Sequence, residues 1–207
     1  KPWEWARSVG GHMWRTTGDI ADNWESMIDI AHRQKELFSY SGPNGWNDPD
    51  MMIVGMYGKG NVAHGGCSTS EYRFHFALWC MLCSPLMIGC DVRKVRDEAK
   101  EILLNRGLIA VSQDPLGAQA RYLGEERGVD AWRKPMADGS GVVGLFNRSK
   151  DCQQATFAWD VLGLHDRRKA RVENVWSGED LGVHDRIFAV RVPTHDCRVL
   201  RLYPQPL

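Results

Sequence analysis

The sequence predicts an α/β region with a parallel sheet, followed by an all-β region with an antiparallel sheet. Residues 1–118 alternate between helix-like and strand-like segments, which is typical of parallel strands covered by helices. Residues 119–207 contain only short alternating segments separated by Gly, Asp-Gly or Pro, which is typical of a small antiparallel β-sandwich. We therefore expect two domains that meet near residue 118.

The composition is that of an ordinary globular protein, with 207 residues of which 43% are apolar and 25% charged. The 26 Lys and Arg balance 26 Asp and Glu, which argues against nucleic acid as a partner and favours a neutral or small substrate. The longest apolar run is broken at Pro85 and is too short to cross a membrane. Because the chain begins without Met or a signal peptide, we expect a part of a longer protein and predict no localisation.

The first region opens with a short helix, which begins at Pro2 and ends at Gly10-Gly11. A strand is expected at residues 12–18 (HMWRTTG), because this segment is rich in β-branched and aromatic residues. The next segment has the apolar spacing of an amphipathic helix. Its stripe is Ile20, Trp24, Met27, Ile28 and Ala31.

The rest of the first region continues the alternation. A second strand is expected at 45–54 (GWNDPDMMIV), and the capping-box pattern Ser68-x-x-Glu71 predicts the start of a helix. Residues 85–90 (PLMIGC) are typical of a buried strand, and residues 97–107 (DEAKEILLNRG) of a helix that Gly107 ends.

The second region contains six strand-like segments, at 130–136, 141–149, 154–159, 170–178, 188–193 and 197–204. One of them carries Asn147-Arg148-Ser149, which has the form of a glycosylation sequon and has meaning only if the protein passes through a secretory pathway.

Residues 12–19 are the most informative for chemistry. On a strand, Arg15, Thr17 and Asp19 point to the same side. The Cα atoms of Arg15 and Asp19 would lie roughly 13 Å apart in an extended strand, but Gly18 permits a bend that brings the side chains together. A carboxylate at the carboxyl end of a strand in a parallel barrel lies where such folds carry out catalysis. From position alone, a helix N-cap is the favoured interpretation of Asp19.

Asp48 and Asp50 flank Pro49 and raise a similar question. Two carboxylates at this spacing could be an acid/base pair, but Asn47-Asp48-Pro49 is also typical turn chemistry. The residues themselves favour the turn, because Pro49 can donate no backbone hydrogen bond, and the rest of the chain must show whether either carboxylate is catalytic.

The cysteines and histidines do not predict a metal site. Cys80 and Cys83 have the C-x-x-C spacing of a redox or zinc site, but they lie in an apolar run, so buried thiols are favoured. His12 precedes the candidate residues on the expected strand, and we expect it to be buried packing. His64 and His75 have no partner at metal-ligand spacing, and we expect core or surface roles for them.

Four ordered motifs give the chain a family resemblance. WRTTGDIADNW, GPNGWNDPDM, PLMIGCD and VSQDPLGAQ together resemble the second half of α-galactosidases of glycoside hydrolase family 27. The resemblance covers residues 1 to about 120 with specific motifs and continues more weakly beyond. It implies the last strands and helices of a (β/α)8 TIM barrel, followed by an antiparallel β-sandwich.

The resemblance also implies roles for particular residues. Members of this family are retaining glycosidases that use one Asp as nucleophile and a second as acid/base. By motif position, Asp19 corresponds to the acid/base at the end of the sixth barrel strand and Arg15 to a substrate-binding arginine. Asp50 and Met51 correspond to residues that line the sugar pocket at the end of the seventh strand, and Asp48 is left to the turn.

Several family features are missing from these 207 residues. They include the Lys-x-Asp motif that carries the nucleophile, the Glu-Trp motif that selects the sugar, and the first-strand aromatic and acidic residues. The resemblance therefore predicts part of an enzyme that removes terminal α-linked galactose from saccharides without metal or cofactor. A sister specificity, such as α-N-acetylgalactosaminidase or β-L-arabinopyranosidase, is the alternative within the enzyme class.

A part of a barrel exposes strand edges, which tend to pair or aggregate. We therefore expect the chain to need the preceding half of the barrel as a partner, and homo-oligomers are a further possibility. A different class of function also stays open, namely a non-catalytic fragment or a carbohydrate-binding module.

Overall fold

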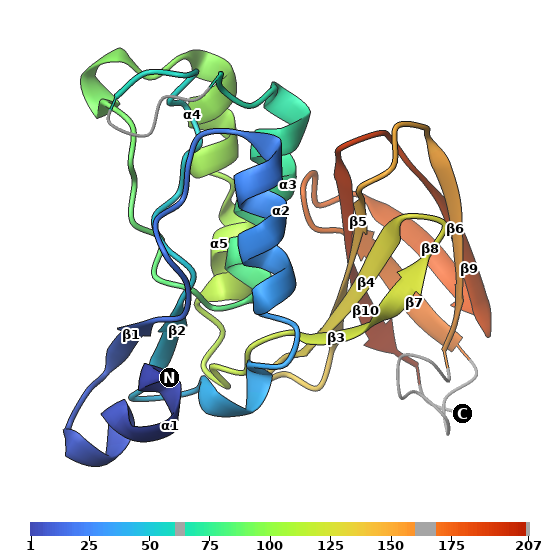
Figure 1. The fold of residues 1–207 in the computed structure, drawn as a ribbon. Coiled ribbons are helices and arrows are strands. Elements are labelled where there is room, and N and C mark those ends of the chain that lie inside the picture. Colours follow the sequence, from blue (N-terminus) through green and yellow to red (C-terminus); the bar gives the residue numbers. More distant parts are fainter. Residues whose placement is uncertain (61–64, 160–168, 206–207) are drawn as a thin grey trace.

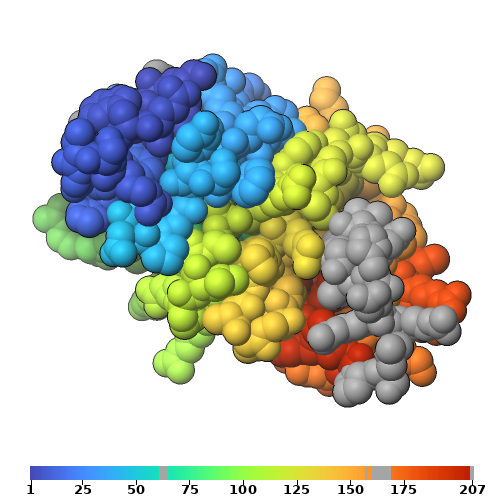
Figure 2. Space-filling model, turned by 90° about the horizontal axis from the view of Figure 1, so that it is seen from below, coloured from blue at the N-terminus to red at the C-terminus, as the bar shows by residue number. Residues whose placement is uncertain are grey.

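The computed structural model describes residues 1–60, 65–159 and 169–205. The N-terminal part forms a group of helices beside two short parallel strands, and the C-terminal part forms a β-sandwich beside it (Figure 1). Seen from below, the N-terminal segment lies on the opposite side of the molecule from the strands near the C-terminus (Figure 2). None of the helices in the described part of the chain is long and apolar enough to span a bilayer.

The N-terminal part begins with α1 and continues through α5. Its elements are α1 (Pro2–Trp5), η1 (Ala6–Val9), β1 (Met13–Arg15), α2 (Trp24–Arg33), η2 (Phe38–Tyr40), β2 (Trp46–Asp48), α3 (Thr69–Met81), η3 (Val92–Lys94), α4 (Asp97–Leu103) and α5 (Arg106–Ser112). β1 and β2 are parallel, with Arg15 opposite Asp48, and a parallel bridge joins Met52 to Ile88. Three successive strand positions therefore run in the same direction, as in the last part of a barrel.

Helix starts follow the capping chemistry of the sequence. The side chain of Ser68 accepts a hydrogen bond from Glu71 N, and Glu71 Oε2 accepts one from Ser68 N, so the predicted capping box is confirmed. α2 begins at Trp24, because the side chain of Asn23 accepts a hydrogen bond from Ser26 N. Asn23 is thus the N-cap of α2, and the interpretation of Asp19 as that cap is wrong.

Two predicted elements differ from the structure. Residues 85–90 form only the single bridge at Ile88, and Met87 and Ile88 are 61% and 49% exposed, so the expected buried strand is absent here. The expected helix at 97–107 is two helices, and Gly107 lies inside the second. A Cβ at Gly107 would overlap the carbonyl oxygen of Val175, so this glycine permits close packing of α5 on the C-terminal part rather than ending a helix.

The C-terminal part is an antiparallel sandwich of a six-stranded sheet and a two-stranded sheet. The larger sheet has the order β3-β4-β5-β10-β7-β8, and the smaller sheet pairs β6 with β9. Their bounds are β3 (Arg121–Glu126), β4 (Val129–Pro135), β5 (Gly141–Asn147), β6 (Gln153–Ala158), β7 (Lys169–Asn174), β8 (Asp180–Asp185), β9 (Ile187–Val192) and β10 (Cys197–Pro204). The six predicted strands are confirmed, whereas β3 and β8 were not predicted. The expected boundary at residue 118 lies in the link between α5 and β3.

Helix α3 joins the two parts through a shared core. Its aromatic residues Phe74 and Phe76 are 1% exposed, and Phe74 packs edge-on against Phe146 of β5. Trp132 and Val199 of the large sheet belong to the same buried cluster. The two parts therefore share one hydrophobic core through α3.

Several polar residues occupy positions that the sequence did not indicate. His12 is exposed, with Nδ1 3.0 Å from the Asn44 carbonyl oxygen, so it is not buried packing. Asn147 is 0% exposed, and its amide nitrogen donates hydrogen bonds to the carbonyl oxygens of Asp151, Val192 and Pro193. This buried amide cannot serve as a glycosylation site in the folded protein. His64 lies outside the described residues.

Candidate active site at the carboxyl ends of β1 and β2

Three of the predicted site residues meet where β1 and β2 end. Arg15 is the last residue of β1, and its Nη2 donates hydrogen bonds to Asp19 Oδ1 at 3.2 Å and to Asp50 Oδ2 at 2.9 Å. The same nitrogen also donates to the Gly18 carbonyl oxygen at 2.8 Å, so the chain bends at Gly18 as expected. One guanidinium thus holds two carboxylates from the ends of neighbouring parallel strands.

Parity along β1 explains why Arg15 reaches this place. Trp14 is 5% exposed and points toward the helices, where its Nε1 donates a hydrogen bond to Asn47 Oδ1 at 2.8 Å. Asn47 in turn donates to the Leu37 carbonyl oxygen and to Gln119 Oε1. Successive side chains on a strand point to opposite faces, so Arg15 projects to the other side.

Asp50 is the most strongly held of the three residues. Its side chain is 14% exposed, and the carboxylate accepts hydrogen bonds from Ile20 N and Met51 N, both at 2.7 Å, in addition to the one from Arg15. Its carbonyl oxygen accepts a hydrogen bond from Trp79 Nε1 at 2.8 Å. Asp50 has φ +95°, a left-handed conformation that Asp tolerates better than most residues.

Asp19 differs from Asp50 in its surroundings. Its side chain is 89% exposed, and among the described residues Arg15 is its partner in an ion pair. A carboxylate held on one side by an arginine and open on the other can approach a bound ligand.

Asp48 behaves as the turn residue that the sequence favoured. Its Oδ1 accepts a hydrogen bond from Asp50 N at 2.9 Å, two residues further along the chain. Burial raises the pKa of Asp48, while the hydrogen bond from Asp50 N and the charge of Arg15 act in the opposite direction. Asp48 therefore shapes the turn that presents Asp50.

Met51 lies next to the three residues but faces a separate cavity. This cavity of about 590 Å³ is lined by Met51, Tyr57, Lys59, Asp91 and Arg96, among others. The structure therefore brings Arg15, Asp19 and Asp50 together, and it places Met51 at the wall of a hollow beside them.

Sequence reasoning missed that Trp79 supports Asp50 from behind and that His75 packs against Trp79. His75 is 0% exposed, and its Nε2 accepts a hydrogen bond from Ile53 N at 3.2 Å. Burial lowers the pKa of His75 to about 3, so it stays neutral and its expected core role is confirmed. His75 and Trp79 are four residues apart on α3, and their ring centroids lie 4.1 Å apart. This i, i+4 pair of rings with polar atoms in an apolar helix was the sequence signal that could have indicated their supporting role.

Asp22 is a second supporting residue that was not predicted. It is 0% exposed, and its carboxylate accepts hydrogen bonds from Gly58 N, Cys67 N and the Tyr72 hydroxyl. These contacts attach the loop after β2 to the segment that follows Asp19. Only the position of Asp22 inside the motif WRTTGDIADNW could have drawn attention to it.

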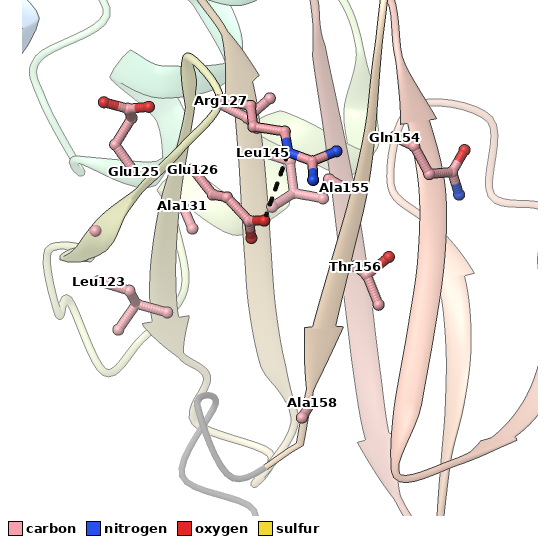
Figure 3. Close-up of a pocket in the computed structure, with 12 residues that line it drawn as sticks. Leu123, Glu125, Glu126, Arg127, Ala131, Leu145, Gln154, Ala155, Thr156 and Ala158 are labelled. Atoms are coloured by element: carbon pink, nitrogen blue, oxygen red, sulfur yellow. Dashed lines mark ion pairs between the residues drawn. The ribbon is translucent and has the colours of Figure 1, made fainter.

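The C-terminal part contains a different cavity, away from these residues. It measures about 240 Å³ and lies between the β3–β4 hairpin and β6 (Figure 3). The described residues around it are mainly aliphatic or small, such as Leu123, Leu145 and Ala155, with a 4.0 Å ion pair between Arg127 and Glu126 at the rim. None of these described lining residues is aromatic.

No group of three or more His, Cys, Asp or Glu side chains in the described part of the chain is placed to hold a metal ion. Cys80 and Cys83 are free, buried thiols, as the apolar run around them predicted.

Comparison with known proteins accounts for both parts of the chain. Residues 7–114 match the family described as alpha galactosidase A, and residues 126–202 match the alpha galactosidase C-terminal beta sandwich domain. The chain belongs to the α-galactosidase family. The observed parallel strands and helices are thus the last part of a (β/α)8 barrel, and the second domain is the family's β-sandwich, as the resemblance implied.

Individual relatives cover nearly the whole chain. Alpha-galactosidase 3 of Arabidopsis thaliana is 40% identical over 205 residues, which are 97% of this chain and 45% of the relative. Alpha-galactosidase I of Mortierella vinacea has a TM-score of 0.90 at 26% identity, covering 99% of this chain and 56% of that one. A family 27 β-L-arabinopyranosidase of Geobacillus stearothermophilus has a TM-score of 0.84 at 26% identity, and the match covers 95% of this chain and 46% of that one. The chain spans about half the length of the relatives it matches.

Proposed function

We propose that the chain is the acid/base-bearing half of a retaining α-galactosidase, which hydrolyses terminal α-linked galactose by double displacement. The observation that carries the proposal is the contact of Arg15 Nη2 with both Asp19 and Asp50 at the carboxyl ends of β1 and β2. Active sites of barrel enzymes lie at this end of the strands. Membership of the α-galactosidase family supports the choice of sugar.

In the proposed mechanism, Asp19 protonates the leaving oxygen and then deprotonates the attacking water. Arg15 donates hydrogen bonds to the sugar hydroxyls, and Asp50 accepts hydrogen bonds from them. Met51, which follows Asp50 in the chain, adds an adaptable apolar wall from the cavity beside these residues. The exposure of the Asp19 side chain, 89% in this chain, is consistent with a group that contacts substrate.

The nucleophile in this proposal is an Asp of a Lys-x-Asp motif that is absent from the 207 residues. We place it in the preceding half of the barrel, since the chain covers 45% of the Arabidopsis relative. In a retaining enzyme its carboxylate should lie about 5 Å from that of Asp19.

The decisive experiment is Asp19→Asn in the full-length protein. Substrates with poor leaving groups, such as raffinose-type sugars, should lose several orders of magnitude in rate, more than the roughly 10²–10⁴ of a single proton transfer, because both steps use this residue. Activated aryl galactosides leave without protonation, so they should still form the covalent intermediate. Azide should then restore turnover and give α-galactosyl azide, because it attacks the face that water normally uses.

Two results would contradict the assignment of Asp19. A β-galactosyl azide product would make Asp19 the nucleophile instead. Equal losses on all substrates with no azide rescue would show that Asp19 has no proton-transfer role.

A sister specificity is tested in the same preparation. Nitrophenyl derivatives of α-galactose, α-N-acetylgalactosamine and β-L-arabinopyranose should show the highest kcat/KM for α-galactose. A preference for the arabinopyranoside would instead match the activity in the name of the Geobacillus relative.

A further inference from the structure

Two residues in unfavourable local settings meet where α3 ends. Cys83 follows the C-cap Leu82 and has φ +52°, a conformation that glycine usually adopts at this position of a helix end. Lys134 of β4 is 0% exposed. No carboxylate among the described residues forms an ion pair with Lys134, although burying an ammonium without one costs free energy. Neither side chain is explained by packing alone.

The two side chains contact each other directly. Lys134 Nζ lies 2.9 Å from Cys83 Sγ and 2.5 Å from the Ala118 carbonyl oxygen. Cys83 Sγ in turn lies 3.4 Å from the same carbonyl oxygen. The sulfur and the nitrogen are thus held against one another, and among the described atoms the shared carbonyl oxygen is their common partner.

A small molecule can reach this pair from outside. Cys83 lines a cavity of about 570 Å³ together with Met13, Trp46, Ser84 and Gln113, among others. Met13 and Trp46 are the first residues of β1 and β2, so the cavity lies at the end of the strands opposite Arg15 and Asp19. An oxidant that enters here does not pass through the candidate active site.

We propose that Cys83 and Lys134 form an oxidative cross-link in which one oxygen atom bridges Sγ and Nζ. The observed 2.9 Å separation is well above the ~2.05 Å of a bond between two sulfur atoms, and it leaves room for one bridging atom. The oxidant is dioxygen, dissolved in the buffer.

The reaction balances in atoms and electrons. The Lys134 ammonium first releases a proton to solvent, and the free amine, the thiol and one dioxygen molecule then give the S–O–N bridge and one water. Sulfur and nitrogen each lose two electrons, and dioxygen gains four. One oxygen atom becomes the bridge, and the other leaves as water with the thiol hydrogen and one amine hydrogen.

The environment of Cys83 sets the expected pH dependence. Burial raises the pKa of the Cys83 thiol, and the nearby Lys134 lowers it by a smaller amount. The thiol is therefore mainly protonated at neutral pH, and cross-linking should be slow there and faster in alkaline buffer.

The bridge would connect the barrel part to the sandwich. Cys83 follows α3, whereas Lys134 lies on β4, so the bond would restrict the unfolded chain and raise thermal stability. The consequence is a protein whose two domains are joined more firmly under oxidising conditions than under reducing ones.

The test compares the full-length protein kept anaerobic with the same protein held in air-saturated buffer. Trypsin should release residues 74–93 and 134–148 as separate peptides from the anaerobic sample, because Pro135 blocks cleavage after Lys134. The aerobic sample should contain the two peptides joined, with one added oxygen and two fewer hydrogens. Its melting temperature should be higher by several degrees, and dithiothreitol should reverse both changes.

Matched variants separate the cross-link from other thiol chemistry. Cys80→Ala should still cross-link, whereas Cys83→Ser, Lys134→Arg and Lys134→Met should not, and their melting temperatures should not depend on dioxygen. Lys134→Met keeps an unbranched side chain one atom shorter and removes the buried charge, and Lys134→Arg keeps the charge, so at least one of the Lys134 variants should fold. Three results would overturn the proposal. They are a disulfide between Cys80 and Cys83, a sulfinic acid at Cys83 with Lys134 unmodified, and unlinked peptides after prolonged alkaline aeration.

Discussion

Replacing Asp50 by Asn tests how the candidate site is held together. Asn keeps the shape of the side chain and tolerates the left-handed backbone at this position, so the change is confined to charge and hydrogen bonding. The carboxylate accepts three hydrogen bonds, from Arg15, Ile20 N and Met51 N. An amide has only one acceptor oxygen, so its NH₂ group must face at least one of these donors.

The expected loss follows from these contacts. A hydrogen bond to a charged acceptor contributes roughly 1.5–3 kcal/mol, and one of the three must be lost outright. The ion pair with Arg15 adds little more than ~1 kcal/mol, because the Arg15 side chain is 38% exposed. We therefore expect Asp50→Asn to lower the free energy of unfolding by about 2–4 kcal/mol.

The assay is a double-mutant cycle in the full-length protein. Urea unfolding of Asp50→Asn, Arg15→Met and the double variant should give a coupling energy of about 1–2 kcal/mol between the two side chains. Asp29→Asn is the control, because Asp29 pairs with Arg33 on an exposed helix face and should contribute under ~0.5 kcal/mol. Additive effects of Arg15 and Asp50, together with unchanged kcat/KM, would refute the claim that their contact organises the site.

Three further predictions concern the same protein. Arg15→Lys should lower kcat/KM at least tenfold, about 1.4 kcal/mol, because Lys lacks the planar fork; unchanged kinetics would remove Arg15 from the site. Burial lowers the pKa of His75 to about 3, so between pH 6.5 and 3 the unfolded chain binds a proton that the folded chain does not. The contribution of neutral His75 to stability is complete above pH 6.5, and it is lost at ~1.4 kcal/mol per pH unit as the pH falls. Urea unfolding measured at several pH values should show this slope, and the slope should be smaller in His75→Gln. Gly107→Ala should lower the free energy of unfolding by about 1–3 kcal/mol, because the added Cβ would push α5 away from Val175. Gly42→Ala is the control and should leave the urea midpoint unchanged, because a Cβ at Gly42 would have no neighbour within 4 Å.

The sandwich was more predictable than the barrel part. Segments such as 141–149 contain Val, Leu and Phe and end at polar residues typical of turns, so the local pattern contains the information that sets β5. The prediction of a strand at 85–90 was wrong because a strand requires a continuous ladder of hydrogen bonds to a neighbouring strand, which the local sequence pattern does not show. Here only Met52 pairs with Ile88, and Met87 is left 61% exposed.

The residues of the candidate site could be predicted from the sequence, whereas the hydrogen bonds that hold them in place could not. Parity along β1 and the bend at Gly18 indicated that Arg15 could meet Asp19. The resemblance assigned Asp50 to the same pocket, but the direct contact of Arg15 with Asp50 was not predicted. The supporting bonds from Trp79 and the loop contacts of Asp22 join residues about 30 to 50 positions apart. Such contacts depend on tertiary packing, which a local pattern does not contain.

The buried amide of Asn147 restricts the hosts in which this protein can be produced. Oligosaccharide transfer in a eukaryotic secretory pathway modifies Asn-x-Ser sequons on chains that have not yet folded. A sugar on the Asn147 nitrogen would remove a hydrogen that the fold uses for the carbonyl oxygens of Asp151, Val192 and Pro193, and it would have no room in a position that is 0% exposed. Secretion from yeast should therefore yield misassembled sandwich domains. Expression in a bacterial cytoplasm, or in another host that lacks the oligosaccharide transferase, should leave Asn147 unmodified and give the correctly folded domain.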